Sequence, residues 1–183
     1  RKYILREVIR LREITFEFDG NDEIVSAKSA FIPKTRVQVY FLENNEWFKP
    51  LSNLLYKAKN GRILPDNDER YSYFSIASLA TLPHLFWKPD VIICNDWQNA
   101  TVPMIYNQIY KSKEFYEDIK TVLIVHNFDE HCAYDRSIYD KLGVKLPNKI
   151  VGKKINCYEA AIEDVDLLIS LDSASKNNTK KLL

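Results

Sequence analysis

The residues of this chain that are best suited to chemistry stand in two short polar stretches, Asn95-Asp96-Trp97-Gln98 and His126-Asn127. Each stretch follows an apolar run rich in β-branched residues, which is the composition of a strand covered on both faces. In open α/β sheets, ligands bind outside the carboxyl ends of the strands. A carboxylate, amides, an indole and an imidazole at such strand ends are suited to hold a sugar or a nucleotide.

Both stretches also have a purely structural explanation. Asn95 or Asp96 can serve only as the cap of the helix expected after the first strand. A single histidine such as His126 is more often a hydrogen-bonded structural residue than a catalytic one. If the two strands are parallel, however, Asp96 and His126 share one edge of the sheet, and that shared position favours a functional pocket.

The elements that must position these residues alternate from residue 69 onward. Helices are predicted over residues 69–86, 99–110 and 149–165, and a last helix is predicted to begin near Ser173. The helix over residues 149–165 is predicted from an apolar stripe at helical spacing, formed by Val151, Ile155, Tyr158, Ile162 and Val165. Buried strands between them end at Asn95-Asp96, at His126-Asn127 and at Ser170 to Asp172. This alternation predicts the α/β fold class, with a doubly wound, mostly parallel sheet, right-handed crossovers and helices on both faces.

The first 68 residues are predicted to be rich in β-structure. Apolar and polar residues alternate over residues 14–18, and a turn at residues 19–22 leads into a second strand over residues 23–32, which together predict a hairpin. A further strand is predicted over residues 36–42, with a more apolar and more buried composition. Two long connections are expected, over residues 45–68 and 128–146. The rings of Trp47, Phe48 and Tyr56 are expected to pack the first of them onto the domain.

Composition limits the classes of function. The net charge of +1 gives no reason to expect binding to nucleic acid or to a membrane, and no run approaches the roughly 18 apolar residues of a spanning helix. The three cysteines lack CxxC spacing, which indicates reduced thiols in a cytoplasmic protein. His126, His131 and Cys132 fit no zinc signature, so no metal is expected. There is no glycine-rich phosphate loop of the GxGxxG or Walker type.

Four segments resemble one known family, in order and with its spacing. The run KPDVIICNDWQNATVPM resembles the "PD(I/V)(I/V)HxxDWQTxLVP" stretch of bacterial glycogen synthases and plant starch synthases. The run that begins VQVYFLENNEWFKP and ends DNDERYSYFS resembles their "VYFIDNxxYFxR" and "DNxxRFxFFS" segments. TVLIVHN resembles "VFTIHN", and AAIEDVDLLISLDSASKN resembles "GIxYADxVTTVSPTYAxE". The resemblance covers roughly residues 36–180, and the first 35 residues match only in strand character.

The resemblance implies a GT-B glycosyltransferase that moves glucose from ADP-glucose to the non-reducing end of an α-1,4-glucan, with retention and without a metal or other cofactor. Residues 1–183 would form a single, incomplete Rossmann-like domain, the acceptor-side half, whose partners are the glucan, the nucleotide sugar and a C-terminal domain of the same protein. Asp96 and His126 would be the catalytic residues, with His126 beside the transferred glucose. The substrate-binding residues would be Asn95, Trp97, Gln98 and Asn127. The expected location is the cytoplasm, or the plastid in a plant.

The sequence also departs from the family pattern. The Lys-x-Gly-Gly-Leu motif is absent, and Phe128-Asp129-Glu130-His131 stands where the family has a Tyr-Gln-Gly stretch. The isolated chain is expected to be inactive, because the donor site is incomplete without the C-terminal domain that would hold the nucleotide sugar. These departures favour one alternative, a glucan-binding or regulatory domain without catalysis. A GT-B transferase with another nucleotide-sugar donor is a further alternative.

Overall fold

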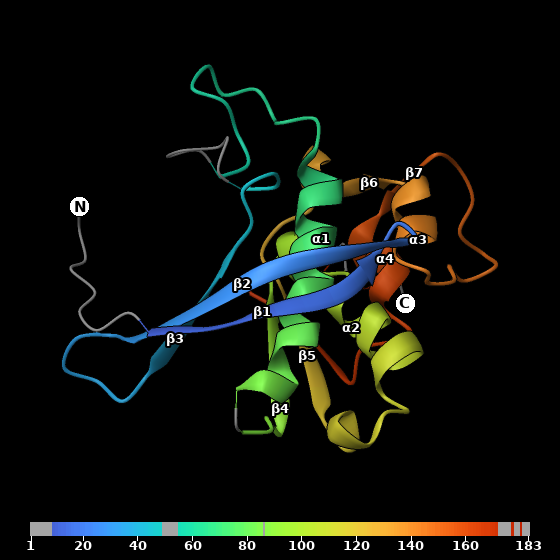
Figure 1. Ribbon diagram of the computed structural model, residues 1–183. Helices are drawn as coiled ribbons and strands as arrows, with labels where there is room; N and C mark the ends of the chain where they lie inside the picture. The colour runs from blue at the N-terminus through green and yellow to red at the C-terminus, as the bar shows by residue number, and fades with distance from the viewer. Residues whose placement is uncertain (1–8, 49–54, 86, 172–176, 178–179, 181–183) are drawn as a thin grey trace.

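The computed structural model describes residues 9–48, 55–85, 87–171, 177 and 180 (Figure 1). Within these residues the strands form an antiparallel sheet in the order β1-β2-β3, a parallel sheet in the order β4-β5-β8, and a small sheet of β6 and β7. Helix α1 (Asn67–Thr81) lies between the hairpin and the parallel sheet. The helix predicted to begin near Ser173 falls outside the described residues.

The predicted hairpin is confirmed. Strand β1 (Ile9–Phe18) pairs with β2 (Asn21–Phe31) up to the pair Phe18 and Asn21. The two turn residues have φ angles of 54° and 70°, the positive values that an Asp-Gly turn accepts readily. The apolar side of β1 packs on α1, where the rings of Phe16 and Tyr73 lie 5.1 Å apart. Strand β3 (Gln38–Glu43) completes the sheet, and its side chains are half-buried or exposed rather than deeply buried.

The parallel sheet has the predicted topology. It contains β4 (Val91–Asn95), β5 (Lys120–Val125) and β8 (Leu167–Ser170). Asn95 is in register with Ile124, and Val125 is in register with Ser170, so the carboxyl ends of the three strands meet at one edge. We refer to this edge as the rim.

The two faces of the parallel sheet differ. On the face toward the helices, Cys94, Leu123 and Val125 are fully buried. The opposite face carries exposed apolar side chains, with Ile93 63% exposed, and the described helices do not cover it. The exposed set comprises Val91, Ile93, Leu167, Ile169 and Leu171. Within the described residues, helices thus cover one face of the parallel sheet, whereas the sequence predicts helices on both faces.

The helices before and after β4 occur where they are predicted. Helix α1 ends in a 3₁₀ turn, Leu82–His84, within the predicted range of residues 69–86. Helix α2 (Val102–Ile105) continues as a π-helical turn, Tyr106–Tyr110, and Pro103 lies in its first turn, where a missing N–H costs nothing. Further 3₁₀ turns lie at residues 97–99, 114–116 and 130–132.

The predicted helix over residues 149–165 is wrong for its first half. The chain forms strand β7 (Lys154–Asn156) and only then the short helix α4 (Cys157–Ala161). Val151, expected in an apolar stripe, is 81% exposed, and Gly152 has a φ of 107° that no helix permits. The side chain of Asn156 caps α4, because its oxygen accepts from the N–H of Tyr158 at 2.9 Å. The connection predicted over residues 128–146 contains β6 (Ala133–Asp135) and α3 (Ser137–Lys141).

Candidate functional site

Asp96 and His126 meet at the rim, as the parallel strands require. The backbone N–H of Asp96 donates to the carbonyl of Ile124 at 2.8 Å, which continues the ladder between β4 and β5. The backbone N–H of His126 donates to Oδ1 of Asp96 at 3.4 Å. The Nε2 atom of His126 lies 2.8 Å from Oδ1 of Asn95. The structure therefore brings the carboxylate, the imidazole and one amide together on consecutive strand ends.

The backbone of Asp96 is strained. Its φ of 68° and ψ of −174° lie in a region that is essentially restricted to glycine, and a side chain there costs about 1–3 kcal/mol. Strain of this kind persists only where the surroundings fix the conformation, and it gathers at functional sites. Asp96 makes no side-chain capping bond to the 3₁₀ turn that follows, so the explanation that it serves only as a cap does not hold.

Tyr158 of α4 fixes the carboxylate of Asp96. Its hydroxyl donates to Oδ1 of Asp96 at 2.5 Å, and its ring, 1% exposed, packs edge-on against Phe128 with centroids 5.2 Å apart. Burial, and then the hydrogen bond to Asp96, raise the pKa of Tyr158 well above its usual value. In the sequence, Tyr158 belongs to the apolar stripe of the helix predicted over residues 149–165, and this role is not predicted there. The one sequence signal for this role is that Tyr158 places a hydroxyl in an otherwise aliphatic stripe.

Trp97 does not offer a ring face to a ligand, which contradicts the expectation that its indole helps to hold a sugar. Its side chain is 1% exposed and is enclosed by the rings of Tyr56, Tyr71, His131 and Tyr134, with centroid distances from 4.7 to 6.4 Å. The hydroxyl of Tyr134 donates to the carbonyl of Trp97 at 2.9 Å. Trp97 therefore anchors the backbone next to Asp96 to the core. The expectation that Tyr56 packs its connection onto the domain is confirmed by its contact with Trp97.

The remaining predicted residues lie near the rim with different accessibility. Asn95 and Asn127 are exposed at the ends of β4 and β5, and Gln98 is half-buried on the 3₁₀ turn Trp97–Asn99. The carbonyl of Asn95 accepts from the side chain of Asn99 at 3.1 Å, which holds the entry to this turn. Asn95 and Asn127 therefore remain open to a ligand, and their substrate-binding role stays a prediction.

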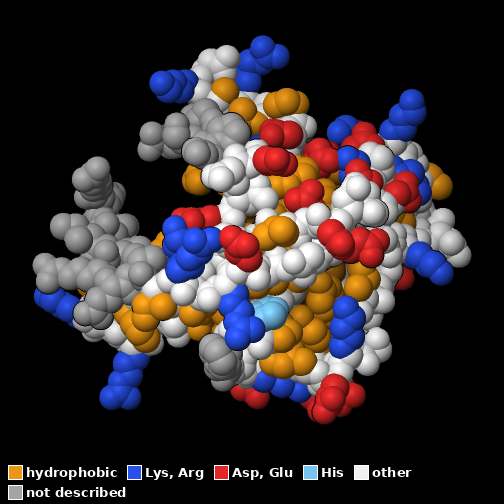
Figure 2. Space-filling view, viewed as in Figure 1, with side chains coloured by type: hydrophobic (Ala, Val, Ile, Leu, Met, Phe, Trp, Pro, Cys, Tyr) orange, Lys and Arg blue, Asp and Glu red, His pale blue; other side chains and the backbone are white. Residues whose placement is uncertain are grey.

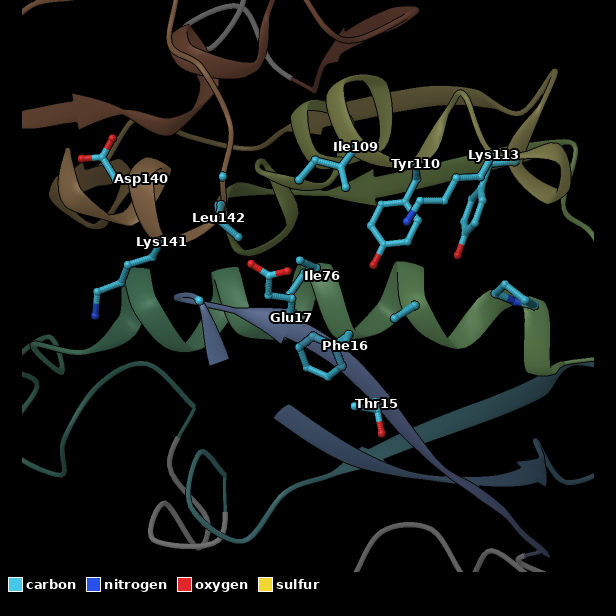
Figure 3. A pocket seen from close by; sticks show the side chains of 15 residues that line it. Thr15, Phe16, Glu17, Ile76, Ile109, Tyr110, Lys113, Asp140, Lys141 and Leu142 are labelled. Atoms are coloured by element: carbon cyan, nitrogen blue, oxygen red, sulfur yellow. The ribbon is translucent and has the colours of Figure 1, made fainter. Parts of the chain in front are cut away.

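A large cavity lies away from the rim. It has a volume of about 790 Å³ and is bounded by β1, α1, α3 and the turns after α2 (Figure 3). Figure 2 shows hydrophobic side chains gathered beneath the hairpin on this face, with Lys and Arg side chains at the margin. The cavity shares no residue with the rim. Among the described residues, no three His, Cys, Asp or Glu side chains are grouped to hold a metal ion, and no described helix is long and apolar enough to cross a membrane.

Comparison with known proteins identifies the family. A family model described as the starch synthase catalytic domain matches residues 2–172. The chain belongs to this family. The glycogen synthase of Chlorobium phaeobacteroides is 33% identical over 174 residues, and that of Pelodictyon phaeoclathratiforme is 32% identical over the same length. Each alignment covers 92% of this chain and 35% of the relative, so the chain spans about a third of the curated relatives it matches.

A solved structure confirms the fold. The catalytic domain of starch synthase IV from Arabidopsis thaliana, bound to ADP and acarbose, matches with a TM-score of 0.73 and 22% sequence identity. The match covers 92% of this chain and 34% of that chain. The predicted Rossmann-like half of a GT-B fold, with its hairpin, is thereby established for this family member, and the predicted resemblance to glycogen and starch synthases is confirmed.

Proposed function

We propose that the whole protein is a retaining glycosyltransferase that transfers glucose from ADP-glucose to the non-reducing end of an α-1,4-glucan. Membership in the starch synthase catalytic domain family and the glycogen synthase names of its relatives support this function. The single observation that carries it is the rim, where the strained Asp96 accepts from the backbone N–H of His126 and the His126 ring contacts Asn95.

Asp96 can act on a sugar through one carboxylate oxygen while the other is held. Both hydrogen bonds described to its side chain, from Tyr158 and from the backbone of His126, go to Oδ1. Oδ2 can then accept from a sugar hydroxyl. A fixed negative charge also stabilises positive charge that develops on the sugar in an oxocarbenium-like transition state. Such stabilisation requires no movement at the moment of reaction.

His126 and the neighbouring amides would orient the transferred glucose. The ring of His126 is half-buried and is tied to Asn95, so its orientation is set before a ligand arrives. Asn95, Asn127 and Gln98 supply hydrogen-bond donors and acceptors for hydroxyl groups. Holding donor and acceptor in a productive geometry is itself a large part of catalysis in a transfer reaction.

The partners and the location belong to the same proposal. The structural neighbour is bound to ADP and acarbose, which supports a nucleotide sugar and an oligosaccharide as ligands here. We infer that the nucleotide is held by parts of the protein beyond these residues, that transfer needs no metal or other cofactor, and that the chain alone is inactive. The free, buried thiols at Cys94, Cys132 and Cys157 support the cytoplasm as the location.

The test is an assay of the whole protein with ADP-glucose and glycogen. Asp96→Asn and His126→Ala should each lower kcat by about 100-fold or more, as expected for the loss of a preorganised polar contact. Near-normal turnover in both variants would show that the rim is only structural. UDP-glucose in place of ADP-glucose tests for another donor, because a preference for it would replace the proposed substrate.

A glucan-binding domain without catalysis is the alternative that one observation favours. In the segment that departs from the family, Phe128 packs on Tyr158 and His131 packs on Trp97. Both rings are engaged inside the protein. Glucan binding measured by calorimetry, together with no transfer from any nucleotide sugar by the whole protein, would support this alternative.

A further inference from the structure

The contact between Tyr158 and Asp96 joins two elements that the sheet alone does not connect. Tyr158 belongs to α4, whereas Asp96 follows β4, and the two residues are 62 positions apart in sequence. We propose that Tyr158 is a positioning residue, which holds the carboxylate of Asp96 in the orientation that glucose transfer requires. This inference rests on the proposed function.

Tyr158 is itself fixed at three points. Its backbone N–H donates to the side chain of Asn156 at 2.9 Å, which sets the first turn of α4. Its ring packs against Phe128. Its hydroxyl reaches Asp96 from a side chain that is almost fully buried. A donor held at its backbone, its ring and its hydroxyl can impose a direction on the group that it contacts.

Asp96 needs such a partner because its strained backbone conformation is not stable without support from neighbouring residues. A residue at a φ of 68° gains by relaxing toward an ordinary conformation, and that movement would carry the carboxylate away from the rim. A hydrogen bond to an ionised acceptor is roughly twice as strong as one between neutral groups. The raised pKa of Tyr158 also keeps the hydroxyl protonated, so it remains a donor across the working range of pH.

Tyr158 acts through Asp96 and not on the substrate. Its side chain is buried, and its hydroxyl is directed to Oδ1, which leaves Oδ2 for the ligand. Loss of the hydroxyl should therefore affect the chemical step and leave substrate binding nearly unchanged. This split between kcat and KM distinguishes positioning of a catalytic group from a general loss of structure.

The first experiment compares Tyr158→Phe with Tyr116→Phe in the whole protein. Tyr116 is a matched control, because it is also buried and its hydroxyl donates to the carbonyl of Leu79 at 2.8 Å, far from the rim. Tyr158→Phe should lower kcat about tenfold or more with KM within about twofold, as expected for the loss of a hydrogen bond to a charged group. Tyr116→Phe should keep its kcat. Equal kcat in Tyr158→Phe and the natural protein would overturn the proposal.

A second experiment tests the contact without enzyme activity. A double-mutant cycle combines Tyr158→Phe with Asp96→Ala and follows the unfolding of the whole protein in denaturant. The change in the unfolding equilibrium constant of the double variant should differ by about threefold or more from the product of the changes in the two single variants. For Tyr116→Phe combined with Asp96→Ala, the change should equal that product. If the effects of Tyr158→Phe and Asp96→Ala simply multiply, the two side chains do not interact and the inference is refuted. Coupling in a protein that transfers no glucose would instead refute the proposed function, and with it any role for this contact in transfer.

Discussion

The strained backbone of Asp96 makes an unusual prediction about alanine and glycine at this position. Asp96→Ala and Asp96→Gly both lose the carboxylate and its hydrogen bonds, and both keep the N–H that donates to Ile124. They differ because glycine adopts a φ of 68° freely, whereas alanine keeps a strain of about 1–3 kcal/mol. Glycine also loses about 0.4–1 kcal/mol through its more flexible unfolded chain. The balance leaves Asp96→Gly more stable than Asp96→Ala by about 1 kcal/mol.

The measurement is urea unfolding followed by circular dichroism, with the slope m checked to be equal in the two variants. Ala100→Gly provides the matched control. Ala100 lies in the same segment as Asp96 and is buried, but its backbone has an ordinary φ of −65°. At that position glycine should be the less stable residue by about 0.5–1 kcal/mol. If Asp96→Ala is as stable as Asp96→Gly, or more so, the backbone of Asp96 is not strained and the reasoning fails.

Two further predictions concern the core. Trp97→Ala should lower the free energy of unfolding by about 3–5 kcal/mol, because a fully enclosed indole leaves a large cavity. A normal melting temperature with lost glucan affinity would instead restore Trp97 as a ligand platform. Burial raises the pKa of Cys94 to about 12, and chiefly burial raises that of Tyr73 to about 12, so the native state keeps these protons longer than the unfolded state. Stability should therefore be nearly full below about pH 8 and should fall as the pH rises toward 12, by about 1 kcal/mol between pH 8 and 10 for Cys94 alone. Denaturant unfolding across this range should show the fall, with a shallower one in Cys94→Ala, and a flat profile would contradict it.

The arrangement of the sheet could be predicted because the signal is local and strong. Apolar β-branched runs such as Val91 to Ile93 mark the parallel strands, and the order of elements then fixes where the strand ends lie. The meeting of Asp96 and His126 follows from that order alone. The Asp19-Gly20 turn was equally readable, because few residues other than glycine, asparagine and aspartate accept its backbone angles.

The parts that could not be predicted depend on contacts between distant segments or on weak local competition. The stripe from Val151 to Val165 has helical spacing, but Gly152 and the cap at Asn156 restrict the helix to one short stretch. The enclosure of Trp97 depends on rings from three other segments, so the spacing of residues around Trp97 does not predict that it is buried. The contact of Tyr158 with Asp96 has the same origin. A tyrosine in an aliphatic stripe shows only that its hydroxyl needs a partner, and not which one.

The bare side of the parallel sheet has a practical consequence for anyone who handles this chain. Ile93 and Leu167 are more than half exposed among apolar neighbours, and both outer strands, β4 and β8, have one edge without a paired strand in the described residues. Exposed apolar surface next to unpaired strand edges favours aggregation. Dilute preparations, or fusion to a highly charged carrier, would keep such molecules apart. A polar replacement at Ile93 would reduce this aggregation without altering the residues of the rim.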